Sequence, residues 1–98
     1  MDKRSWKFLT VLFLFSFFLS GCYYFSANNE INKAGKLVAE LKAAGGANSV
    51  PYEYCSAEKF LEASNIEFTQ GDYKPAKELA SRSTSAAEAG LAEIKKKK

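Results

Sequence analysis

The sequence contains no histidine, so the side chain that most often acts as a general base or metal ligand near neutral pH is absent. Its two cysteines cannot form a zinc site without further ligands. Glu58 and Glu62 have the spacing of one helix face, but solvated carboxylates at this spacing are ordinary. No nucleophile, base and orienting group can be assembled from these residue types. We therefore expect a protein that is not an enzyme and binds no metal.

Bulky apolar side chains are scarce after residue 21. The 77 residues from 22 onward include 14 alanines and few large apolar side chains beyond the first positions. A segment this short and this poor in bulk can form one small core at most. The sequence thus limits the chain to one domain.

Residues 22–98 also lack a clear excess of one charge, with 11 basic and 10 acidic side chains. Four of the basic residues are Lys95 to Lys98, so the remainder carries 7 basic against 10 acidic side chains. This balance argues against a nucleic-acid partner, because such surfaces are strongly basic.

The first 21 residues have the layout of a bacterial signal peptide. Lys3, Arg4 and Lys7 precede an apolar block from Phe8 to Leu19, and small residues lead to Cys22. An uncleaved single-pass anchor is the alternative, because the apolar run extends almost unbroken to Phe25 and approaches the ~20 residues that span a bilayer. Ordinary secretion with cleavage elsewhere is a further alternative.

Leu19, Ser20, Gly21 and Cys22 resemble the lipobox of bacterial lipoproteins. In that family the cysteine sulfur receives a diacylglycerol and the signal peptide is removed. The resemblance therefore implies that Cys22 is the first residue of the mature protein, with covalent lipid acyl chains such as palmitate and no other cofactor. Tyr23 follows the cysteine, where Asp is the usual inner-membrane retention signal of Gram-negative lipoproteins. By resemblance, the protein is anchored in the outer membrane and faces the periplasm.

Apolar periodicity predicts an all-α fold, either a small three-helix bundle or a helical hairpin, with helices at about 29–44, 51–70 and 73–94. Gly45-Gly46 and Gly71-Asp72 provide the helix ends, and Pro51 suits a first turn. The sequence thus divides into a signal peptide at 1–21, a lipidated tether at 22–29, a helical domain at 30–94 and a lysine tail at 95–98. The aromatic residues Tyr23 to Phe25 belong either to a simple tether or to the lipid headgroup level.

Each predicted helix has an apolar face that we expect to point inward. These faces comprise Ile31, Ala34, Leu37, Val38, Leu41 and Ala44; then Tyr54, Ala57, Phe60, Leu61, Ser64 and Phe68; then Tyr73, Ala76, Leu79, Ala80, Ser83, Ala86, Ala87, Leu91 and Ile94.

The middle helix carries a second, weaker apolar stripe of Tyr52, Cys55, Ala63 and Ile66. A helix apolar on two sides either packs centrally in a bundle or reserves one side for a partner. We expect central packing with Cys55 as a small buried thiol. A face for a protein partner or a second copy of the chain is the alternative.

Several short motifs in the last two helices resemble an uncharacterised bacterial lipoprotein family with a domain of unknown function. They are Pro51-Tyr52-Glu53-Tyr54, Ala57-Glu58, Leu61, Gly71-Asp72-Tyr73, Ala76 and Leu79-Ala80. Gly-Asp-Tyr-x-x-Ala also resembles the turn and second helix of a tetratricopeptide repeat, which implies protein or peptide recognition. Only one such unit is present, whereas stable arrays need at least about three.

These observations predict an envelope lipoprotein that binds a protein partner or acts as a scaffold through a helical surface. The alternative is a structural tether between outer membrane and cell wall, in which Lys95, Lys96, Lys97 and Lys98 contact an anionic surface. Lys98 would then be linked to peptidoglycan, as its resemblance to the terminal lysine of the major outer-membrane lipoprotein implies.

Overall fold

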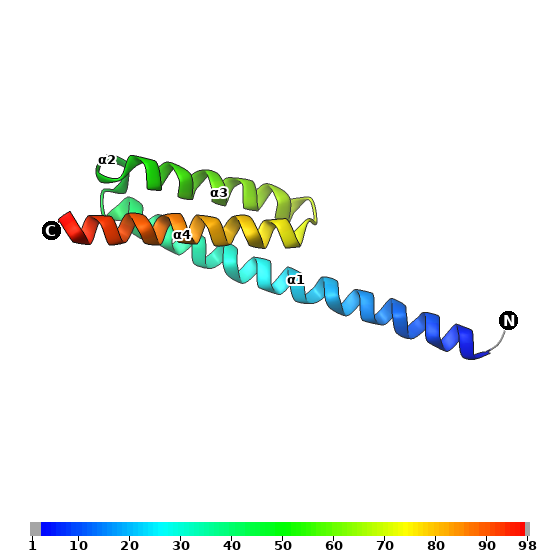
Figure 1. Cartoon of the computed structure of the whole chain (residues 1–98). Coiled ribbons are helices and arrows are strands. Elements are labelled where there is room, and N and C mark those ends of the chain that lie inside the picture. Colours follow the sequence, from blue (N-terminus) through cyan, green and yellow to red (C-terminus); the bar gives the residue numbers. More distant parts are fainter. Residues whose placement is uncertain (1–2, 98) are drawn as a thin grey trace.

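A computed structural model describes the backbone of residues 3–97 and the side chains of residues 5–15 and 22–97. It contains the helices α1 (Lys3–Ala43), α2 (Gly46–Ser49), α3 (Pro51–Thr69) and α4 (Tyr73–Lys97), with no strand among residues 3–97. The second half of α1 packs with the antiparallel pair α3 and α4, while the first half extends away from them (Figure 1). The predicted all-α fold and its small helical bundle are confirmed.

The helix boundaries at the glycines follow the prediction. Gly45 has φ 82° and Gly71 has φ 85°, in the left-handed region that glycine adopts without a steric penalty. The Asp72 N–H donates to the Glu67 carbonyl (2.9 Å), which closes the end of α3. Pro51 occupies the first turn of α3, as predicted. Between Gly45 and Pro51, Gly46–Ser49 forms the short helix α2.

The predicted helix start near residue 29 is wrong, because α1 is continuous from Lys3 to Ala43. Residues 22–29, the predicted lipidated tether, are therefore helical. The sequence contains no proline here, and an interior asparagine costs a helix only about 0.7 kcal/mol relative to alanine. Packing of Ala27, which is fully buried, against the bundle stabilises this part of α1. At the other end, α4 continues to Lys97, beyond the predicted residue 94.

The fully buried part of the core has one bulky side chain among small ones, and larger half-buried side chains pack against it. Leu41 is fully buried and contacts a cluster that includes Val38, Val50, Ala57 and Ala87. The inward faces predicted for α3 and α4 are buried or half-buried, as expected. On α1 the prediction fails only at Ala44, which is exposed because the helix ends at Ala43. The small side chains allow close helix packing but bury little apolar area each.

Two serine hydroxyls connect α3 and α4 inside the bundle. Ser64 Oγ donates to the Ala76 carbonyl and Ser83 Oγ donates to the Ala57 carbonyl, both at 2.6 Å. Both serines are fully buried. These bonds satisfy polar atoms that would otherwise destabilise a buried interface.

Replacing Ser83 should separate the roles of its hydrogen bond and its small size. We expect Ser83→Ala to lower the free energy of unfolding by about 0.5–1.5 kcal/mol. Ser83→Val should lower the free energy of unfolding by about 1–3 kcal/mol, because the larger, branched valine side chain does not fit the close α3–α4 contact. The measurement is urea denaturation followed by circular dichroism. The same substitutions at exposed Ser85 on α4 are the control, and equal losses at both positions would contradict the assigned packing.

Candidate functional site

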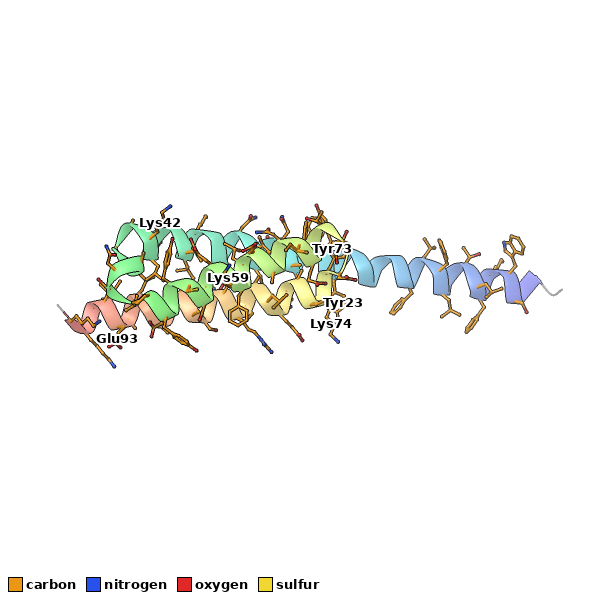
Figure 2. The ribbon with its side chains drawn as sticks, turned by 90° about the horizontal axis from the view of Figure 1, so that it is seen from above. Tyr23, Lys42, Lys59, Tyr73, Lys74 and Glu93 are labelled. Atoms are coloured by element: carbon orange, nitrogen blue, oxygen red, sulfur yellow. The ribbon has the colours of Figure 1, made fainter. Side chains whose placement is uncertain are left out.

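Cys22 on α1 is exposed, and the next residue, Tyr23, lies at the end of the bundle from which the first half of α1 extends (Figure 2). Among the described side chains of α1, Ala27 is the first that is fully buried. On the other side of Cys22, the large apolar side chains from Trp6 to Phe15 are all at least 50% exposed. None of the described side chains before Cys22 therefore contributes to the buried core. The side chains of Leu19, Ser20 and Gly21 lie outside the described residues.

Within the described part of the chain, no helix is both long and apolar enough to cross a membrane.

An aromatic cluster joins the three long helices near Cys22. The ring of Tyr24 on α1 lies 5.2 Å from that of Phe68 on α3 and 5.2 Å from that of Tyr73 on α4, between centroids. Phe68 and Tyr73 are 5.3 Å apart in a T-shaped arrangement. Such geometries are favourable for aromatic pairs. The cluster therefore fixes the α3–α4 turn beside the segment that follows Cys22.

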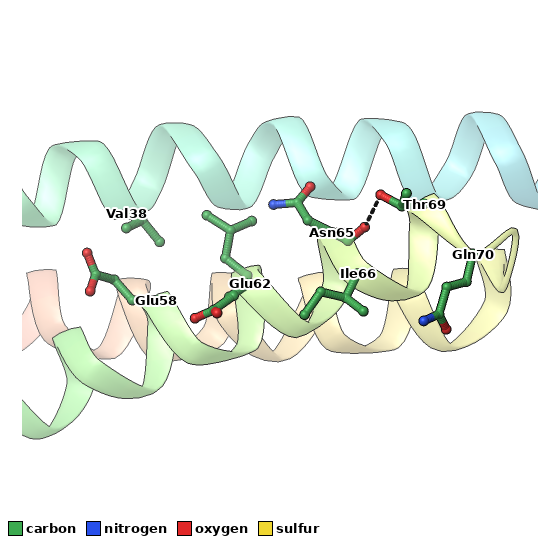
Figure 3. Close-up of a pocket in the computed structure, with 8 residues that line it drawn as sticks. Val38, Glu58, Glu62, Asn65, Ile66, Thr69 and Gln70 are labelled. Atoms are coloured by element: carbon green, nitrogen blue, oxygen red, sulfur yellow. Dashed lines mark hydrogen bonds between the residues drawn. The ribbon is translucent and has the colours of Figure 1, made fainter.

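A groove of about 720 Å³ lies between α1 and α3 (Figure 3). It forms because α4 packs along both of these helices, whereas α1 and α3 contact each other less. Its apolar side chains are Val38, Leu61 and Ile66. The polar lining comprises Glu58, Glu62, Asn65, Thr69 and Gln70, so the groove has two carboxylates and no cationic side chain.

Glu58 has a defined neighbour at the edge of this groove. Its Oε1 accepts a hydrogen bond from the Tyr54 hydroxyl at 2.6 Å. This bond, with partial desolvation and the negative charge of Glu58, raises the pKa of Tyr54 above its ordinary value. Glu62 lies 3.9 Å from Lys59, in an exposed ion pair that contributes little to stability. The hydrogen bond from Tyr54 thus positions the carboxylate of Glu58, while the carboxylate of Glu62 stays exposed to solvent.

The Tyr54–Glu58 pair predicts a specific pH dependence. Because folding raises the pKa of Tyr54, the pair stabilises the fold below the ordinary tyrosine pKa of about 10, and this contribution is lost as the pH rises through the raised value. Glu58→Gln should therefore lower the pKa of Tyr54. The pKa is measured from the ultraviolet absorbance of tyrosinate as the pH is raised. Subtracting the same titration of Tyr54→Phe isolates the signal of Tyr54 from that of the other tyrosines. Glu62→Gln is the control; an equal shift in both variants would contradict the assigned pair.

The stripe proposed as a partner face lies mostly in solvent. Tyr52 is 79% exposed, Ile66 is 51% exposed, Cys55 is exposed and Ala63 is half-buried. The expectation of a buried Cys55 in a centrally packed helix is wrong. Helix α4 is the one that packs along both neighbours, so α3 lies at the side and keeps one face outside. Ile66 alone of these four residues also lines the groove.

The last turn of α4, which carries Lys95 to Lys97, lies at the end of the bundle opposite the one from which the first half of α1 extends (Figure 1). Figure 2 shows the same separation, with Tyr23, Tyr73 and Lys74 at one end and Lys42 and Glu93 at the other.

The tail residues described, Lys95, Lys96 and Lys97, are exposed. Lys97 Nζ donates to the Ser49 carbonyl at 3.0 Å, which ties the last turn of α4 to α2. Lys98 lies outside the described residues.

Sequence reasoning missed the groove. Val38 belongs to the core, as predicted, and also lines the groove, while the sequence marks Glu58 and Glu62 only as ordinary surface carboxylates. The polar residues Asn65, Thr69 and Gln70 carry no periodic signal that would single them out. Their convergence depends on how α1 and α3 pack against α4, which local patterns do not specify.

Among the side chains that the structure describes, no group of three or more His, Cys, Asp or Glu residues is placed to hold a metal ion. In comparisons with known proteins, no family model, no curated protein and no solved structure matches this chain.

Proposed function

We propose that this protein is a lipoprotein of the bacterial cell envelope, anchored by acyl chains on Cys22 and acting by binding. The observation that carries the proposal is the place of Cys22, which is exposed and lies five residues before Ala27, the first fully buried residue among the described side chains of α1. Cleavage before Cys22 would leave every described buried contact intact, since the described side chains before it are exposed. The lipobox resemblance of residues 19–22 supports the anchor, and Tyr23 supports the outer membrane.

The groove between α1 and α3 is the surface that we assign to the partner. Its apolar floor and two carboxylates fit an amphipathic helix with basic side chains, from another envelope protein. Such a helix would cover Leu61 and Ile66 and complete a four-helix arrangement. Its lysines or arginines would reach Glu58 and Glu62. Charge complementarity would then determine the orientation of the bound helix and the choice of partner.

A pair of designed peptides tests the groove. An amphipathic leucine–lysine peptide should bind residues 22–98, and a leucine–glutamate peptide of equal length should not. Glu58→Lys/Glu62→Lys should weaken binding of the lysine peptide at least about tenfold, which corresponds to 1.4 kcal/mol. Fluorescence anisotropy of labelled peptides measures both affinities.

The matched control for this charge reversal is Glu88→Lys/Glu93→Lys on the exposed face of α4. It changes the net charge by the same amount away from the groove, and we expect close to parental affinity. An equal loss in the two double variants would show that only net charge matters and would contradict a specific groove.

A wall tether is the second candidate, and the position of the lysine tail favours it. The α1 segment from Cys22 to Ala43 is about 32 Å long at 1.5 Å per residue. The described tail residues lie near the far end of this segment, so they face away from the anchoring membrane. A tether should cosediment with purified cell-wall sacculi only while Lys95 to Lys98 are present. Binding to sacculi that survives replacement of all four lysines would contradict this alternative.

A further inference from the structure

The end of the bundle next to Cys22 has an unusual surface. Among residues 22–97, the large apolar side chains that are clearly exposed are Tyr23, Tyr24, Phe25, Tyr52 and Ile66. Three of these five are consecutive and directly follow the cysteine. Phe25 is 68% exposed, although its ring lies 5.6 Å from that of Tyr24. The bundle therefore concentrates uncovered aromatic area at one end, where we place the anchor.

The α3–α4 turn lies at the same level as these rings. Tyr24 contacts Tyr73, the first residue of α4, with ring centroids 5.2 Å apart. Tyr24 is only two residues from Cys22, which is about 3 Å along a helix axis. A surface that holds Cys22 must therefore meet the turn as well, as long as α1 stays helical. In Figure 2 Tyr23, Tyr73 and Lys74 lie together at this end.

The charges at this end are mixed. Lys74 is exposed, and Lys77 lines a shallow pocket with Cys22, Tyr23 and Ser26. Asp72 is exposed on the turn itself and offsets part of this positive charge. Aromatic rings, in contrast, favour the headgroup level of any bilayer, whether or not it is anionic. The rings therefore provide the main attraction.

We infer that this end of the bundle, with the α3–α4 turn, docks on the phospholipid headgroup layer and holds the bundle upright on the membrane. This inference rests on the proposed anchor at Cys22. Phe25 and Tyr23 enter the interface, and Tyr73 lies at its edge. The groove and the lysine tail are then presented away from the membrane, toward partners in the adjacent compartment.

Tryptophan reporters test the orientation. Trp6 is the only tryptophan in the chain, so Trp6→Phe provides a silent background. The reporter is Tyr73→Trp at the turn, and the matched control is Tyr52→Trp near the opposite end of α3. Both are made in the full chain, matured in cells, purified and placed in phosphatidylcholine vesicles with brominated acyl chains. We expect a blue-shifted, strongly quenched reporter at residue 73 and an unquenched one at residue 52.

A second reporter pair lies outside the aromatic cluster, because Tyr73→Trp could itself disturb the packing of that cluster. Lys74→Trp and Lys42→Trp replace exposed lysines, and residue 42 lies about 30 Å along α1 from Cys22. Lys74→Trp should be quenched and Lys42→Trp should not. Equal quenching in a pair would show a bundle lying flat on the bilayer and would overturn the inference.

The anchor and the docking surface can fail separately. The intact mass of each vesicle-bound sample reports acylation at Cys22. Acylated protein with no quenching at residues 73 and 74 would overturn the docking surface alone. If such protein also sediments as a dimer, a second copy covers the rings instead. Protein without acyl chains that does not bind vesicles would instead overturn the proposed function.

Discussion

Leu41→Ala should lower the free energy of unfolding by about 2–5 kcal/mol. Leu41 is the largest fully buried side chain among the residues described, and Val38, Val50, Ala57 and Ala87 form the buried cluster around it. Two glycines approach it closely: a Cβ at Gly90 would meet Leu41 Cδ1 at 3.0 Å, and one at Gly46 would meet its Cγ at 2.6 Å. Ala57, Ala87 and the two glycines have no side-chain atoms that could extend into the space that Leu41 leaves, so we expect a cavity to persist on this side.

This loss is large for a domain of this size, because small proteins are stable by only about 5–15 kcal/mol in total. Urea denaturation of residues 22–98, followed by circular dichroism, measures it. Ile66→Ala is the control, since Ile66 is 51% exposed and should cost less than about 1 kcal/mol. A similar loss at both positions would mean that Leu41 is not the centre of the core.

Cys22→Ser should abolish lipid attachment completely, which is the largest functional effect that we expect of any single substitution. A serine hydroxyl is a much weaker nucleophile than a thiolate and cannot form the thioether that the lipobox resemblance implies. Cells supplied with radiolabelled palmitate should label the parent protein and not the variant. The variant should accumulate with residues 1–21 still attached.

Cys55→Ser is the matched control for this experiment. Cys55 is also an exposed thiol, but it lies on α3 and outside the lipobox. We expect unchanged labelling in Cys55→Ser. Labelling that survives in Cys22→Ser but disappears in Cys55→Ser would show that Cys55 is the acylated residue and would contradict the anchor at Cys22.

The parts of the fold that sequence predicted are those set by single residues. Gly45 and Gly71 end their helices because a positive φ favours glycine, and Pro51 starts α3 because its fixed φ suits a first turn. The alanine-rich face of α4 was also predictable, since a helical period in apolar residues identifies the buried side. Each of these signals is local.

The parts that sequence did not predict depend on packing between helices. Nothing near residue 29 stops a helix, so the start of α1 could not be located from a candidate cap alone. The exposure of Cys55 and the groove beside Leu61 follow from the position of α4 between its neighbours. The sequence predicts that Ser64 and Ser83 point inward, but the carbonyls that accept their hydrogen bonds depend on how α3 and α4 pack.

The arrangement of the two ends relates the proposals to one another. With an anchor at Cys22 and a wall contact at the far end of α4, as we propose, the bundle would be a spacer of about 32 Å in height. A partner helix in the groove and a wall contact at the tail use different surfaces, so one molecule can do both. An uncleaved anchor would instead retain residues 1–21 and add their length to the same helix.

The intact mass of the protein extracted from membranes and from lysozyme-digested wall tests the central claim most directly. We predict a chain that begins at Cys22 and carries acyl chains. A further increment from a peptidoglycan fragment at Lys98 would add the wall tether to this account. An unmodified chain beginning at Met1 would contradict the lipoprotein proposal and favour the uncleaved single-pass anchor.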